Sequence, residues 1–94
     1  MADLPANTED TLLEFPCRFP LKVMGERHDD FVPTVVDIVQ IHAPDFDAEL
    51  DLVMRESSSG KYQSLTMTVN AASKAQLDRI YQALTGHPLV KVVL

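Results

Sequence analysis

The sequence predicts an α+β fold of the ferredoxin-like βαββαβ type, with a four-stranded antiparallel sheet and two helices on one face. Three short segments alternate apolar and polar residues, as strands with one buried face do, and a fourth, at residues 89–94, is a short apolar run. Two longer segments repeat apolar residues at helical spacing and separate the strands into that order. The chain has 94 residues, which is enough for one domain of ordinary size and excludes a multidomain enzyme.

The first strand is predicted from Phe19 to Met24, where apolar residues occupy every second position. Pro20 has no N–H to donate, so regular pairing should start at or just after it. Gly25 should end this strand. Before it, residues 1–11 contain three acidic residues and a proline, and we expect a mobile leader there and a single domain over residues 12–94.

The first helix is predicted from Phe31 to His42. Its β-branched residues favour a strand by propensity, but a length of about twelve residues and helical spacing decide for a helix. Asp29 or Asp30 can cap its start, and Pro33 fits its first turn. The residues that repeat at helical spacing are Val32, Val35, Val36 and Val39.

A hairpin follows, with strands predicted over residues 48–55 and 64–69 and a turn over residues 57–61. Glu49 and Asp51 point outward from the first of these strands and should discourage pairing along this edge of the sheet.

The second helix is predicted over residues 73–84 because Ser73 and Gln76 have the spacing of a capping box. Gly86 ends it, and residues 89–94 form the last strand. Right-handed crossovers place the first and third strands in the middle of the sheet and the other two at its edges.

One sheet face should remain open, because both helices cover the other. The last strand is apolar on both sides, with Leu89 and Val93 predicted on the open face beside Met24. Contiguous exposed apolar surface marks an interaction site, unless residues 12–15 fold back over it. By the same alternation the inward residues of this strand are Val90, Val92 and Leu94.

The charge is unevenly distributed. Fourteen acidic and eight basic residues give a net charge of −6, which works against nucleic acid and anionic membranes as partners. Residues 1–56 carry a charge of −9 (13 acidic, 4 basic) and residues 57–94 carry +3 (1 acidic, 4 basic). This asymmetry fits a solvated acidic surface, or alternatively an acidic docking face or self-association through complementary charge.

Five short stretches occur in a characteristic order, at residues 13–16, 22–25, 42–44, 58–62 and 90–94. Together they resemble the YbeD-like family of small bacterial proteins of uncharacterised function. The resemblance covers most of the chain and implies a ferredoxin-like fold similar to ACT-type regulatory domains. It also implies a link to lipoate metabolism and brings no established catalytic residues.

The side chains suited to nucleophilic or metal chemistry are few. Cys17 is the only cysteine, so it forms no intrachain disulfide, and it is better explained as a small buried hydrophobe than as a nucleophile beside His28 or His42. Those two histidines and His87 lack the spacing of a metal site, and we expect no metal or cofactor. Without a signal peptide or long apolar run, the expected location is cytoplasmic.

The loop at residues 25–30 offers an enzymatic alternative. Acylphosphatases of the same fold hold phosphate in this loop with an arginine, here Arg27, although three neighbouring carboxylates would repel such a substrate. Gly60 and Lys61 suit a hairpin turn better than a phosphate-binding loop. Tyr62 is the single aromatic residue available for stacking RNA bases on the open face.

The leading hypothesis is a non-enzymatic regulatory or adaptor module that binds a protein partner or a small ligand and that can self-associate. The alternative is a small acylphosphatase-like enzyme acting on an acyl or phosphoryl group. Binding is expected on the open face and the adjoining loop, at Met24, Gly25, Arg27, His28, Leu89 and Val93.

Overall fold

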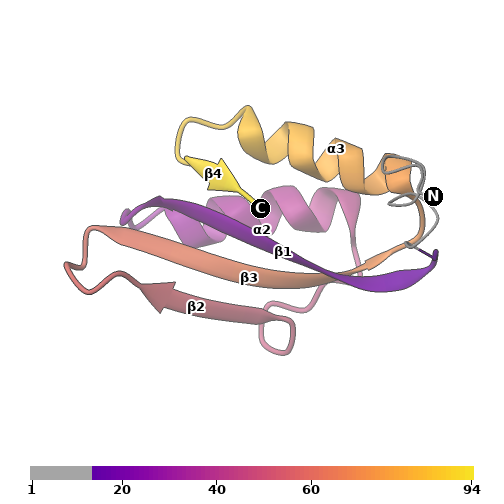
Figure 1. The fold of residues 1–94 in the computed structure, drawn as a ribbon, viewed down its shortest axis with the longest axis horizontal. Helices are drawn as coiled ribbons and strands as arrows, with labels where there is room; N and C mark the ends of the chain where they lie inside the picture. Colours follow the sequence, from indigo (N-terminus) through magenta and orange to yellow (C-terminus); the bar gives the residue numbers. More distant parts are fainter. Residues whose placement is uncertain (1–13) are drawn as a thin grey trace, which may run out of the picture.

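The computed structural model describes residues 14–94, which form one antiparallel sheet with two helices packed on one of its faces (Figure 1). The strand order is β2-β3-β1-β4, so the predicted fold class and the predicted central strands are confirmed. The predicted leader, residues 1–11, lies outside the described residues. The elements are β1 (Cys17–Glu26), α2 (Phe31–His42), β2 (Leu52–Glu56), β3 (Tyr62–Ala71), α3 (Lys74–Thr85) and β4 (Val92–Val93).

The core lies between the sheet and the two helices. Every second residue of the long central strands points into it, as the alternation predicted. Burying each large apolar side chain contributes about 1.5–3 kcal/mol, so this layer supplies most of the driving force for folding. The largest fully buried side chains are Phe31, Leu21, Leu65, Met67, Ile80, Leu84, Val23, Val35, Val39 and Val69.

β1 is longer than predicted at both ends. Lys22 N–H donates to the Leu94 carbonyl at 3.1 Å, which shows that even-numbered residues of β1 turn their N–H groups away from β3. Pro20 therefore sits inside the strand without removing a bond to β3. Gly25 does not end the strand. A Cβ there would lie 2.6 Å from the Phe31 ring and closer still to the Leu89 carbonyl oxygen, so the site requires glycine.

α2 has the predicted bounds but not the predicted cap. Asp30 occupies the N-cap position without a side-chain bond to the helix. Instead, His28 accepts twice, its Nδ1 from Asp30 N–H at 3.0 Å and its carbonyl from Phe31 N–H at 3.0 Å. The imidazole and the backbone of one residue thus fix the turn that leads into the helix.

α3 begins at the predicted capping residue. Gln76 N–H donates to Ser73 Oγ at 3.1 Å, and Gln76 Oε1 accepts from Ala72 N–H at 2.7 Å. The Gln76 amide also donates to the His42 carbonyl at 2.8 Å. One side chain therefore joins the start of α3 to the end of α2.

β2 starts four residues later than predicted. Asp47 Oδ1 accepts from Glu49 N–H at 2.8 Å and from Leu50 N–H at 3.2 Å, which holds this segment in a turn. Leu50 is 83% exposed as a result, although the alternation predicted it inside. The hydrogen bonds of the Asp47 side chain therefore determine the local structure here, in place of the strand that the apolar alternation predicted.

The predicted facing of β4 is wrong. Lys91 N–H donates to the Met24 carbonyl at 2.8 Å, and Val92 also lies opposite Met24, so two residues face one as in a β-bulge. The bulge reverses the alternation that follows it. Val93 pairs with Val23 and packs against the core together with Leu89, while Val92 takes the open face.

Candidate functional site

The open face contains an apolar depression near the β2–β3 hairpin, which we call the apolar trough. Val92, Met24, Ser64 and Arg55 form one row across all four strands by their pairing. Val92 is 42% exposed and Met24 is half-buried, so both present carbon and sulfur to solvent. The trough has a volume of about 370 Å³, and Tyr62 stands at its hairpin end.

Cations stand at both ends of the trough. Arg55 comes from β2 and Lys91 from the bulge before β4, and both side chains are exposed. Three strand spacings of about 4.8 Å separate the ends of this row, so the two strands that carry the cations lie about 14 Å apart. Neither cation forms an ion pair with another residue of the 14–94 range. The trough thus combines an apolar floor with two cations that have no ion-pair partner in this range, and its wall also includes Glu56, whose carboxylate is paired with Arg27.

The far end of the open face is neutralised. Arg18 donates to Asp51 Oδ1 at 2.7 Å and to Asn70 Oδ1 at 3.0 Å. This arginine, and then the backbone N–H of Asp47, lower the pKa of the Asp51 carboxyl below its ordinary value by stabilising the ionised form. The pair neutralises Arg18, and the Asp45 carboxylate beside it accepts from Asn70 Nδ2 at 2.7 Å.

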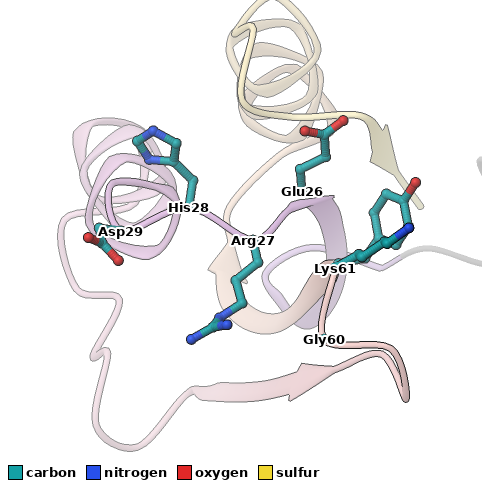
Figure 2. Close-up of a pocket in the computed structure, with 7 residues that line it drawn as sticks. Glu26, Arg27, His28, Asp29, Gly60 and Lys61 are labelled. Atoms are coloured by element: carbon teal, nitrogen blue, oxygen red, sulfur yellow. The ribbon is translucent and has the colours of Figure 1, made fainter.

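A second, polar pocket of about 560 Å³ lies between the loop after β1 and the hairpin (Figure 2). Arg27 N–H donates to the Lys61 carbonyl at 2.8 Å, which fixes the loop to the hairpin. Arg27 Nε lies 3.6 Å from Glu56 Oε2, so its charge is already opposed. In Figure 2 Glu26 and Arg27 point to opposite sides of the chain, and the charges do not converge on one point. The residues around the pocket are Glu26, Arg27, His28, Asp29, Gly60, Lys61 and Tyr62.

Comparison with known proteins identifies the family. Residues 10–94 match the family model described as "Protein of unknown function (DUF493)". The chain belongs to the DUF493 family. The predicted resemblance to YbeD-like proteins is thereby confirmed.

Close relatives of this DUF493 chain are called UPF0250 proteins. The protein from Chromobacterium violaceum is 60% identical over 89 residues, which cover 95% of this chain and 99% of the relative. UPF0250 protein NMC1112 from Neisseria meningitidis is 52% identical over 84 residues, which cover 89% and 91% of the two chains. The solution structure of protein HP0495 from H. pylori superimposes with a TM-score of 0.71 at 13% identity, covering 100% of this chain and 98% of that one, and it shows the shared fold.

The structure of this DUF493 protein divides the predicted site residues among three places. Met24 lies in the apolar trough, and the backbone of Gly25 contributes to its wall. Arg27 and His28 line the polar pocket instead. Leu89 and Val93, predicted on the open face, both pack against the core: Val93 because of the bulge, and Leu89 because it lies in the turn before β4, where its N–H donates to His87 Nδ1.

Sequence reasoning missed the trough residues from the other strands. Arg55 and Lys91 were not selected, because only the strand register brings them beside Met24. Val92 was assigned to the core, and no feature of the sequence announces the bulge that turns it outward. Tyr62 was weighed only as a platform for RNA bases.

Other candidate groups have structural roles. Cys17 packs against the core but is half-buried, whereas a buried side chain was predicted. His87 Nδ1 accepts from Leu89 N–H at 3.1 Å. Within residues 14–94 no three His, Cys, Asp or Glu side chains are grouped so that they could hold a metal ion. In the same range, neither helix has the length and apolar character needed to span a bilayer.

Proposed function

We propose that this protein is a non-catalytic binding module whose apolar trough takes a small ligand with an apolar body and an anionic group. One observation carries the proposal: Met24 and Val92 form an apolar floor between Arg55 and Lys91. The volume of about 370 Å³ falls in the usual range for small-molecule sites.

The apolar floor and the two cations of the trough contribute differently to recognition of the ligand. Removing apolar surface from water supplies about 25 cal/mol per Å² and has no preferred direction. Charge-assisted hydrogen bonds from Arg55 or Lys91 to a carboxylate give the ligand its orientation and reject cations of equal length. The net charge of −6 repels anions at long range, so recognition depends on these close contacts.

A role in regulation and the link to lipoate metabolism remain predictions. What supports them is the chemistry of the trough, because a medium-chain carboxylate is a ligand of the class described above. A protein partner would have to present the same combination of an apolar group beside an acidic one.

The charges around the polar pocket do not suit acyl or phosphoryl transfer at the loop, and we therefore favour a binding function. An acylphosphatase-like centre needs an arginine free to meet phosphate, whereas Arg27 faces Glu56 and shares its pocket with Glu26 and Asp29. These carboxylates would oppose a phosphate dianion at the place where the enzyme requires positive charge.

The test is a titration of the ¹⁵N-labelled protein with octanoate and, as the matched control, octylamine, which has the same chain and the opposite charge. We expect octanoate to shift the amide signals of Met24, Ser64 and Val92, and octylamine to leave them in place. Replacing both Arg55 and Lys91 with alanine should abolish the response. Equal responses to the two compounds, or none to octanoate, would refute the proposal.

A further inference from the structure

The outer edge of β2 carries unpaired backbone groups. Thr68 N–H donates to the Asp51 carbonyl and Ser57 N–H to the Tyr62 carbonyl, both at 2.9 Å, so odd-numbered residues of this segment bond to β3. Leu52, Met54 and Glu56 consequently turn their N–H and C=O groups away from the sheet. No other part of residues 14–94 pairs with this edge, which is the lower border of the sheet in Figure 1.

This edge also exposes apolar side chains on both faces of the sheet. Val53 is 59% exposed on the open face, and Met54 is 53% exposed on the face that carries the helices. The opposite edge is protected differently, because Pro20 removes a donor from the part of β1 that β4 does not cover. Glu49 was predicted to discourage pairing along β2, but it lies in the turn before the strand and so does not guard this edge.

We propose that β2 pairs antiparallel with β2 of a second copy of this chain, with the two-fold axis at Val53. The sequence selects this register. It places Val53 opposite Val53 of the second copy, Leu52 opposite Met54 of the second copy, and Arg55 opposite Asp51 of the second copy. By symmetry the apolar and charged pairs occur twice.

The neighbouring symmetric register is poorer. With the axis at Met54, Arg55 would face Val53 of the second copy, and Glu56 would face Leu52 of the second copy. Both charges would then lie against apolar groups and gain no opposite charge. The register centred on Val53 also uses groups that remain available, because the carboxylate of Asp51 has acceptor capacity beyond its bonds from Arg18 and Asp47 N–H.

Stable interfaces between proteins bury at least about 1,200 Å² of surface in total, and a pair of short strands buries less than this. The association should therefore be weak and increase with protein concentration. It joins two four-stranded sheets into one and leaves the apolar trough of each copy on the open face. In the pair, Arg55 faces Asp51 of the second copy, so pairing and the proposed anionic ligand compete for this arginine.

The first experiment is sedimentation velocity from micromolar to millimolar protein, with Met54→Pro and, as the control, Met54→Val. Proline at this position removes an outward N–H and leaves the bonds to β3 in place. We expect the unaltered protein and Met54→Val to associate as concentration increases, and Met54→Pro to remain monomeric. Monomeric behaviour of the unaltered protein throughout would overturn the inference, as would unchanged association of a folded Met54→Pro.

A second variant covers the case in which proline disturbs the fold. In a Cys17→Ser background, Val53→Cys places a thiol opposite its own copy, at a spacing that suits a disulfide. Ser58→Cys, in the exposed hairpin turn, is the matched control. We expect oxidation to a covalent dimer about tenfold faster for Val53→Cys, because pairing raises the effective thiol concentration. Equal rates for the two variants would contradict the proposed register.

Discussion

The apolar trough and the polar pocket meet at Tyr62, yet they treat charge in opposite ways. In the pocket, Arg27 is opposed by Glu56, and further carboxylates line the wall. In the trough, Arg55 and Lys91 stand beside apolar surface and form no ion pair within the described chain, and the one carboxylate in the wall, Glu56, is paired with Arg27. We therefore expect an anion to select between these two adjacent hollows by whether their basic residues are paired, and not by how many basic residues each contains.

Among the predicted changes, Gly25→Ala should have the largest effect on the free energy of unfolding. It tests whether Gly25, in the wall of the trough, has a structural role. The added methyl group would overlap the Phe31 ring and the Leu89 carbonyl, and we expect a loss of about 3 kcal/mol in the free energy of unfolding. Gly86→Ala is the control, because its Cβ would lie 3.2 Å from the Gln82 carbonyl and its backbone is helical. Urea denaturation measures both, and similar losses would show that Gly25 has no special packing role.

The next effect concerns ligand affinity and tests the comparison directly. Arg55→Ala should weaken octanoate binding about tenfold, the cost of one charge-assisted contact, whereas Arg27→Ala should leave it unchanged. Calorimetric titration of the two variants gives the answer. A larger loss for Arg27→Ala would transfer the site to the polar pocket.

A smaller effect should appear at the far end of the open face. The pKa of Asp51 is lowered in the folded state, so its ionised form stabilises the protein above the unfolded pKa, and this contribution is lost as pH falls through the folded value. Asp51→Asn should therefore be less stable than the unaltered protein at neutral pH, and the difference should shrink in strong acid. Denaturation curves at neutral pH and in strong acid measure this difference in stability. A difference that grows as the pH falls would contradict a stabilising role for the ionised Asp51.

The smallest effect is expected from the ion pair of the polar pocket. Glu56→Gln should change the free energy of unfolding by less than about 0.5 kcal/mol, because both side chains are well exposed to water. The same variant frees Arg27, so any new octanoate binding in the loop would show that pairing had kept the pocket closed to anions. A stability loss above about 1 kcal/mol would mean that this surface pair is structural.

The sequence predicted the layers of the fold because its strongest patterns are also its longest. The alternation in β1 and β3 and the helical period of α3 continue without interruption through the core. Prediction was wrong where short local bonds compete with the pattern. Asp47 holds a turn where alternation predicted a strand, and the bulge at Lys91 exchanges the faces of Val92 and Val93.

The candidate site was harder to predict than the fold. Met24 was selected from the sequence, but its partners come from strands far away in the chain and meet it only through the register. Arg27 and His28 were selected with the loop that adjoins the open face, but they follow the end of β1 and line a separate pocket. Adjacency in the sequence is a poor guide to adjacency across a sheet.

The most direct test of the account is an isotope-filtered NOE spectrum of the labelled protein with unlabelled octanoate. We expect contacts from the octanoate chain to the methyl groups of Met24 and Val92, with the carboxylate end toward Arg55 or Lys91. Contacts confined to the loop that carries Arg27 and His28, or spread evenly over the surface, would contradict it.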